Sequence, residues 1–322
     1  TPTASGSAPG ADGGTAWLST RIEAIRGKTG RLRRIAVICR DVSAMRDSQL
    51  KLVQAREYEV EVGARIQQSL LLGKPEASYA GMQIGAFTLP SQKIDGDFVD
   101  FFLSRSGDET DFVLGDVMGK GVPAALLGAA ARTALMKSRF RAGEKDGSRA
   151  PHLATVLKET ENSLSGELQK LNSFVTLIYA RISRTVKLLQ FIDCGHTSMI
   201  HYDSLGGHCW RLKGANMPLG FTGSQEFREY SVGLAEGDII FVYSDGITEA
   251  ASSEGELFGE ERLMHLIRSS AALDTEALLQ KIKMITFAYC AGAFSDDVTG
   301  IAIKITPEED QSPVRIRSAA FP

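Results

Sequence analysis

The chain has 322 residues, a formal net charge of −3, 43% hydrophobic residues and 23% charged residues. This composition is ordinary for a soluble globular protein, and its slightly acidic balance argues against general binding of nucleic acids. The stretch nearest to a membrane span, VPAALLGAAARTALM, contains Arg132 and is shorter than the roughly 20 apolar residues that a spanning helix needs. No contact with a membrane is therefore predicted.

The N-terminal segment and the cysteines favour a cytoplasmic protein. The segment TPTASGSAPGADGG has neither the basic end nor the apolar core of a signal peptide. Its small and polar residues leave little to bury, so residues 1–14 are predicted to be disordered. The four cysteines lie far apart, form no CxxC motif and are predicted to be reduced thiols (Cys39, Cys194, Cys209 and Cys290).

Residues 15–47 are predicted to form a β-hairpin. The strands are TAWLSTRIEAIR and LRRIAVICRDVS, joined by the turn GKTGR. The end of the second strand, Asp41-Val42-Ser43, resembles the end of the last hairpin of a PAS sensor domain, so this segment is interpreted as the C-terminal part of a PAS-like sensor. The alternative is a free-standing hairpin, which would be only marginally stable.

Residues 48–74 are predicted to form a linker helix, because Tyr58, Val62, Ile66 and Leu70 recur every four residues and charged residues fill the opposite face. Two interpretations stay open. The helix could carry a signal and support a homodimer, or it could lie as an amphipathic helix on its own domain. Its position before the larger domain motivates the hypothesis that the sensor-like hairpin and the helix regulate that domain.

Residues 75–306 are predicted to form one α+β domain, and residues 307–322 a loose tail. Consecutive strands with short turns favour antiparallel pairing, and the long helices come in pairs instead of alternating with single strands. The expected strands are 82–89, 98–103, 110–116, 173–183, 187–193, 197–202, 208–212, 228–233, 238–243 and 298–305. The expected helices are 122–140, 151–169, 259–270 and 274–290.

Four aspartates stand at the ends of apolar strands, in IDGDF, FVLGDVMGKG, FVYSDGITEA and FSDDVTGIAI (Asp97, Asp116, Asp245 and Asp296). A single aspartate there is usually a turn former or a helix cap. If the strand ends converge, however, four carboxylates repel one another unless cations lie between them. Oxygen ligands without nearby histidine or cysteine select hard cations, so the pattern predicts a site for Mg²⁺ or Mn²⁺.

The motifs GDF, GDVMGKGVPAALL, FVTLIYARIS, FIDCGHTSMI, GDIIFVYSDGITEA, FGEERL and SDDVTGIAI occur in this order. Together they resemble the SpoIIE/RsbU branch of the PPM-type (type-2C-like) protein serine/threonine phosphatases, from about Ala64 to Ile305. The resemblance implies an α-β-β-α sandwich of two mainly antiparallel sheets flanked by helices, with a two-ion Mn²⁺ or Mg²⁺ site.

The resemblance also implies roles for individual residues. Asp97 would bind one ion, Asp116 would bridge both with the Val117 carbonyl as a further ligand, and Asp245 and Asp296 would bind the other. A metal-bridging hydroxide would attack phosphoserine or phosphothreonine, so Asp97 and Asp116 count as catalytic. The implied substrate is a phosphorylated STAS-type anti-sigma-factor antagonist or a similar phosphoprotein, which places the chain in sigma-factor regulation.

Two features depart from the family pattern. Asp95 precedes Gly96, where the family usually has a second glycine. The family's Gly-His motif often continues with prolines but here reads GHTSMI, and His196 is predicted to be a hydrogen-bonded residue at a strand end and not a catalytic acid. Lys120 is interpreted as a solvated loop residue, with contact to a substrate phosphate as the alternative.

Other classes of site fit less well. DVMGKG is similar to the Asp-x-Gly-x-Gly box of histidine-kinase-type ATP-binding domains, but its spacing differs by one residue. The sequence around Gly119 and Lys120 has no Walker loop, and no cysteine begins the Cys-x₅-Arg motif of cysteine phosphatases. The alternative to an enzyme is a non-catalytic scaffold that binds a STAS-type partner.

Overall fold

A computed structural model describes residues 3–9, 15–26, 30–52, 77–79, 81–89, 96–104, 107–145, 150–221, 225–292 and 294–307. The chain divides into two compact units, Thr1–Val62 and Gly63–Pro322. In the described part of the chain, no helix combines the length and the apolar character needed to cross a membrane.

The first unit contains a three-stranded antiparallel sheet of β1 (Thr3–Pro9), β2 (Thr15–Arg26) and β3 (Leu32–Asp41). The hairpin predicted from the sequence is present as β2 and β3. The prediction of disorder is wrong for residues 3–9, because β1 pairs with β2 along its whole length. Small side chains do not prevent such pairing, since the ladder uses only backbone groups.

A hydrogen-bonded turn connects this sheet to a helical segment over residues 43–52. The Ser43 amide donates to the Asp41 carboxylate at 2.9 Å, and the Ser43 hydroxyl accepts from the Trp17 amide at 2.8 Å. The Arg46 guanidinium lies 3.5 Å from the centre of the Trp17 ring. The rest of the predicted linker helix, residues 53–74, lies outside the described residues, and the PAS-like assignment stays a prediction.

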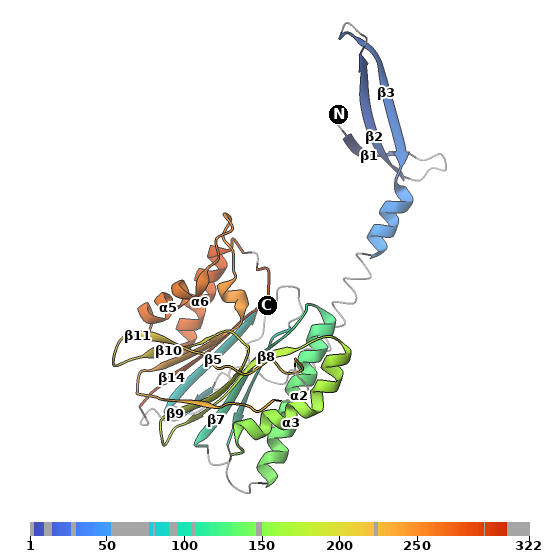
Figure 1. The fold of residues 1–322 in the computed structure, drawn as a ribbon. Helices are drawn as coiled ribbons and strands as arrows, with labels where there is room; N and C mark the ends of the chain where they lie inside the picture. The colour runs from blue at the N-terminus through green and yellow to red at the C-terminus, as the bar shows by residue number, and fades with distance from the viewer. Residues whose placement is uncertain are drawn as a thin grey trace. The chain divides into compact units, whose positions relative to one another are not determined.

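The second unit contains two antiparallel sheets (Figure 1). The first has the order β11-β10-β13-β14-β5-β4, with bounds His208–Leu212, Met199–Asp203, Ile239–Tyr243, Val298–Ile305, Met82–Leu89 and Ala77–Tyr79. The second has the order β12-β9-β8-β7-β6, with bounds Tyr230–Gly233, Leu188–Cys194, Val175–Ser183, Glu109–Val117 and Phe98–Leu103. The strands predicted from the sequence are all present, with ends that shift by two residues or fewer, and the short β4 is an addition to them.

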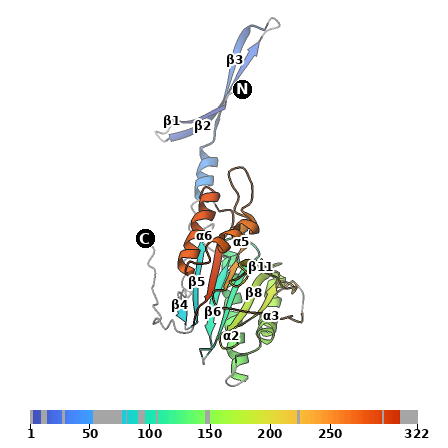
Figure 2. The same cartoon turned by 90° about the vertical axis from the view of Figure 1, so that its left-hand side faces the viewer.

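Helices cover the outer face of each sheet, as Figures 1 and 2 show. Helices α2 (Val122–Lys145) and α3 (Leu153–Lys170) pack on the sheet that contains β7 and β8. Helices α5 (Gly259–Ser269) and α6 (Thr275–Tyr289) pack on the sheet that contains β13 and β14, with the short α4 (Asp245–Thr248) beside them. The predicted α-β-β-α sandwich is therefore confirmed.

The alternation of side chains along each strand divides the hydrophobic core into three layers. In β7, Phe112 and Leu114 face the opposite sheet, whereas Val113 and Val117 face α2 and α3. This follows from the two-residue period of a strand, which sends successive side chains to opposite faces. Asp116 has the same parity as Phe112 and Leu114, so it belongs to the face that looks across the gap between the sheets.

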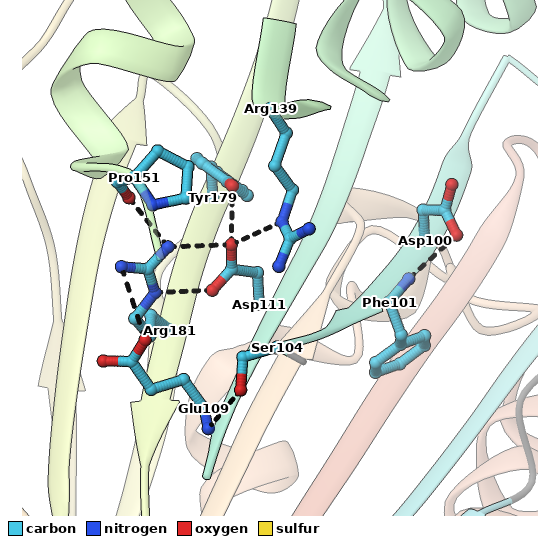
Figure 3. A network of polar contacts seen from close by, with 9 residues as sticks. All are labelled: Asp100, Phe101, Ser104, Glu109, Asp111, Arg139, Pro151, Tyr179 and Arg181. Carbon is cyan, nitrogen blue, oxygen red and sulfur yellow. Dashed lines mark hydrogen bonds and ion pairs between the residues drawn. The ribbon is translucent and has the colours of Figure 1, made fainter. Parts of the chain in front are cut away.

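Asp111 of the same strand faces the helices and is completely buried, yet cations surround it (Figure 3). Arg181 of β8 donates to both of its carboxylate oxygens, at 2.6 and 3.0 Å, and also to the Pro151 carbonyl at 2.8 Å. The Arg139 side chain and the Tyr179 hydroxyl donate to it at 2.8 and 2.9 Å. The network ties β7 and β8 to α2 and to the start of α3.

We expect Asp111→Asn to destabilise the protein by about 3–5 kcal/mol, because it removes the closest counter-ion of the buried Arg181 and leaves the more distant Glu109 at 4.0 Å. Urea unfolding followed by circular dichroism measures this change. Glu236→Gln is the control: Glu236 pairs with Lys187 at 2.9 Å on the surface, with about half of each side chain exposed, so its loss should cost less than about 1 kcal/mol. Equal effects of the two substitutions would contradict the importance assigned to the buried network.

Candidate active site

The predicted aspartates come together at one end of the sandwich. Asp116 lies near the end of β7, and Asp97 directly precedes β6, whose first residue pairs with Gly115. Asp245 follows β13, and Asp296 comes two residues before β14; the end of β13 pairs with the start of β14. Antiparallel pairing thus places both aspartates of each sheet at the same edge.

Asp297 joins the two sheets at this edge. Its side chain accepts a hydrogen bond at 2.9 Å from the amide of Gly96, which is 201 residues away in the sequence. Its backbone carbonyl accepts from the Ser244 hydroxyl at 3.1 Å, and Ser244 in turn accepts from the Thr299 amide at 2.9 Å. The sequence pattern places Asp297 beside a metal ligand but does not predict this connecting role.

Gly246 permits close backbone contact within the site, and Gly96 lies at ordinary contact distance from a neighbouring segment. A Cβ atom on Gly246 would lie 2.0 Å from the Asp297 carbonyl oxygen, which is impossible without rearrangement. A Cβ atom on Gly96 would lie 3.5 Å from the Val117 carbonyl oxygen and 3.6 Å from the Asp116 carboxylate. Gly96 therefore lies directly against the Asp116–Val117 segment, which holds the neighbouring Asp97 close to it.

The carboxylates raise one another's pKa values. Burial, followed by the charges of Asp245, Asp296 and Asp297, raises the pKa of Asp116 from 3.8 to about 7. Burial and then the charge of Asp116 raise the pKa of Asp97 well above its usual value, and hydroxyl groups of neighbouring residues oppose this only in part. Burial and nearby carboxylates also raise the pKa of Asp245. Ionising these carboxyls together therefore costs free energy in the folded protein.

A cation from the loop between β7 and α2 lies at the rim of this cluster. The Lys120 ammonium group is 2.9 Å from the Asp296 carboxylate and donates to the Ser295 carbonyl at 2.7 Å. The hydrogen bond to Asp296 raises the pKa of Lys120. The sequence context predicts a solvated lysine, and the side chain is indeed about half exposed, but it has a specific anionic partner far away along the chain.

A cavity of about 400 Å³ opens beside Asp116 and Asp245. His196 lies in its wall, 5% exposed, with its ring Nδ1 3.0 Å from the Thr176 hydroxyl and its backbone amide bonded to the Asp193 carboxylate. Burial and then the charge of Lys213 lower the pKa of His196 to about 3, so the ring is neutral near pH 7. The predicted hydrogen-bonded histidine is confirmed, and no cationic acid is present at this position. The other lining residues are Met118, Phe174, Thr176, Gly195 and Thr197.

The donor set fits a hard divalent cation, although the side chains do not enclose one as they are oriented. Across the residues described, no three carboxylate, imidazole or thiolate groups form a ready-made ligand set. The donors that gather are carboxylate oxygens and the Val117 carbonyl, the ligands that Mg²⁺ and Mn²⁺ prefer. A divalent cation would also relieve the repulsion that raises the pKa of Asp116. Asp95 lies outside the described residues.

Comparison with known proteins identifies relatives. A family described as stage II sporulation protein E (SpoIIE) matches residues 106–306, which is more than half of the chain. The match includes Asp116, Asp245 and Asp296 and begins after Asp97.

The chain is 27% identical over 204 residues to phosphoserine phosphatase RsbU of Bacillus subtilis, covering 63% of this chain and 57% of that protein. It is 28% identical over 284 residues to protein IcfG of Synechocystis, covering 80% and 44%. The chain thus spans about half the length of the curated relatives it matches.

Solved structures share the fold. The SiaA-PP2C domain of Pseudomonas aeruginosa matches with a TM-score of 0.63 at 23% identity, over 80% of this chain and 98% of that domain. The RsbU and RsbW domains of a Mycobacterium tuberculosis protein match with a TM-score of 0.60 at 23% identity, over 73% and 64%. At this level of identity the likeness establishes the fold.

We expect Gly246→Ala to disrupt the junction between α4 and the Asp297 segment, because the new methyl group would overlap the Asp297 carbonyl oxygen. A loss of more than about 2 kcal/mol is expected, in the range found for overpacked sites. Gly166→Ala is the matched control: Gly166 lies in α3 with no atom within 4 Å of the added methyl group, so this change should stabilise the protein by about 0.4–1 kcal/mol. Thermal unfolding of both variants measures the difference, and a harmless Gly246→Ala would contradict the close contact.

Metal-free protein should become less stable as the pH rises from about 5 to about 7. Because the folded state raises the pKa of Asp116 from 3.8 to about 7, the folded protein holds a proton in this interval that the unfolded chain has already released. A rise in pH therefore favours the unfolded chain until the folded carboxyl ionises near pH 7. Asp116→Asn removes the ionising group and should reduce the difference. Thermal unfolding in EDTA at both pH values measures it. Asp203→Asn, in the turn at the end of β10, should keep the wild-type pH dependence; an unchanged dependence in Asp116→Asn would argue against carboxylate crowding.

Proposed function

Because this chain belongs to the stage II sporulation protein E (SpoIIE) family, we propose that it is a metal-dependent protein serine/threonine phosphatase. The observation that carries the proposal is the gathering of strand-end carboxylates beside an open cavity. Burial, followed by repulsion from the neighbouring carboxylates, raises the pKa of Asp116 to about 7. Carboxylates with perturbed pKa values in a cleft are typical of functional sites. The similarity to a protein named phosphoserine phosphatase supports the same reaction class.

In this proposal Asp97, Asp116, the Val117 carbonyl, Asp245 and Asp296 hold two Mn²⁺ or Mg²⁺ ions. When bound, such ions supply an activated water and neutralise the charge of a phosphoryl group. Because the carboxylates come from both sheets, the packing between the sheets sets their separation. The side chains must reorient to complete a ligand set, and the half-buried Asp116 and Asp245 lie on the cavity wall, where a ligand can reach them.

The chain's own residues shape the place where the phosphoryl group would lie. Met118 and Phe174 form apolar walls of the cavity, and the Phe221 ring packs against Phe174 with ring centres 6.1 Å apart. His196 is neutral near pH 7 and hydrogen-bonded to Thr176. It orients the wall of the cavity and cannot supply a proton as an imidazolium ion.

We also propose a substrate and a setting. The substrate is a phosphorylated STAS-type anti-sigma-factor antagonist or a similar phosphoprotein, and the protein acts in the cytoplasm. Similarity to proteins that carry RsbU and RsbW domains supports a partner-switching role. Residues 15–74 would regulate the phosphatase, and the linker helix 48–74 would support a homodimer. Equal turnover and equal oligomeric state of the full chain and of residues 63–322 would contradict this regulation.

The alternative is a scaffold that binds the same partner without hydrolysis. The absence of a ready-made ligand set among the described residues favours it. The pKa of Asp116, which its carboxylate neighbours help to raise, favours the enzyme, because a scaffold has no need for uncompensated buried charge. Hydrolysis of a generic aryl phosphate separates the two functions.

We expect hydrolysis of p-nitrophenyl phosphate that depends on Mn²⁺ or Mg²⁺ and stops in EDTA. Asp245→Asn should lower kcat by at least about 100-fold, beyond the 10–100-fold typical for residues that only support metal ligands. Asp203→Asn, at the opposite end of the sheet from Asp245, should retain wild-type turnover. No turnover together with no Mn²⁺ binding in folded wild-type protein would favour the scaffold.

A further inference from the structure

Lys120 connects two segments that each carry a proposed metal ligand. It lies in the loop between β7, which bears Asp116, and α2, and it reaches the segment that precedes β14. There its ammonium group contacts the Asp296 carboxylate at 2.9 Å and the Ser295 carbonyl at 2.7 Å. One of the carboxylates assigned to the metal is thus already paired with a cation that belongs to the chain.

This pairing is easily reversed. The side chains of Lys120 and Asp296 are 46% and 34% exposed, and an ion pair at such exposure contributes only about 0–1 kcal/mol. Gly119 and Gly121 flank the lysine with φ angles of +111° and +78°, and no atom lies within 4 Å of the place where either would carry a Cβ. The loop therefore has room to redirect the lysine without breaking packed contacts.

A divalent cation would compete with Lys120 for the Asp296 carboxylate and would bind it more strongly. At equal distance an ion of charge +2 interacts twice as strongly as an ammonium group, and it accepts several carboxylate oxygens at once. Repulsion between the two cations then disfavours the original position of the lysine. A released ammonium group in this loop lies where it can meet an anion bound over the carboxylates.

We propose that Lys120 is an exchangeable counter-ion of the site: it holds Asp296 until a divalent cation takes its place, and then it binds the phosphoryl group of the substrate. The inference rests on the proposed metal-dependent phosphatase function. It assigns to one lysine two effects of opposite sign, since the side chain weakens metal binding and strengthens phosphate binding. A purely structural role would weaken both or neither when the lysine is removed.

The test compares wild type with Lys120→Met, which keeps most of the side-chain length and removes the charge. Mn²⁺ affinity is measured by electron paramagnetic resonance of the free ion. It should become about two- to fivefold tighter in the variant, as expected for the loss of an exposed competing ion pair. The inhibition constant of inorganic phosphate, measured at saturating Mn²⁺, should rise about tenfold, as expected for a lost hydrogen bond to a charged group.

Two further variants keep the outcome interpretable. Lys120→Arg retains the charge and should bind Mn²⁺ within about twofold of wild type, and Lys187→Met, in a surface pair with Glu236, should change neither constant. Unchanged or weaker Mn²⁺ binding in folded Lys120→Met overturns the counter-ion role, and unchanged phosphate inhibition overturns the second step. Absence of Mn²⁺ binding in wild type overturns the proposed function itself, so the two failures are distinguishable.

Discussion

The repulsion among carboxylates at one end of the sandwich is the constraint on which the rest of the structure depends. Asp97 and Asp116 come from one sheet, and Asp245 and Asp296 from the other. Their charges oppose the approach of the two sheets. The apolar side chains between the sheets, from Phe112 and Leu114 of β7 to Ile301 and Ile303 of β14, supply the opposing force. The fold holds together a set of charges that would otherwise separate.

Two aspartates of the same strand have very different surroundings. Asp111 and Asp116 both lie in β7, on opposite faces of the strand. The Asp111 carboxylate accepts hydrogen bonds from two arginines and a tyrosine in a buried network. Asp116 faces other carboxylates and an open cavity, and its pKa rises to about 7. The first contributes to stability, whereas the second keeps a charge available for a ligand, and this difference carries the functional proposal.

The contacts across the end of the sandwich explain how so few residues organise the site. The Asp297 side chain bonds to the Gly96 amide, its carbonyl accepts from Ser244, and Gly246 lies against it without a side chain. Asp297 is therefore a structural link beside the proposed ligand Asp296. Lys120 forms a second link, on the solvent side, that can open. A rigid connection inside and an exchangeable one outside suit a site that must hold its shape while it takes up an ion.

Much of this protein could be predicted from the order of its residues. The two-residue alternation and the turns locate the strands of the sandwich other than the short β4, because these patterns depend on local backbone geometry. An aspartate at either end of an apolar strand is likewise a local signal, and it points to Asp97, Asp116, Asp245 and Asp296 without any knowledge of tertiary contacts. The strand β1 escapes prediction because its Gly, Ala and Ser residues carry no hydrophobic signal, whereas its pairing with β2 is a backbone interaction.

Only the tertiary structure decided which partner each charge receives. The sequence singles out Asp116 at a strand end but does not show how the charge of Asp111 is compensated, since the arginines that pair with Asp111 are 28 and 70 residues away along the chain. The same holds for Lys120, whose sequence context predicts a solvated loop but whose ammonium group reaches Asp296. Hydrophobic periodicity depends on residues that are close in the sequence. The pairing of opposite charges depends instead on distances that are set only when the sheets and helices pack.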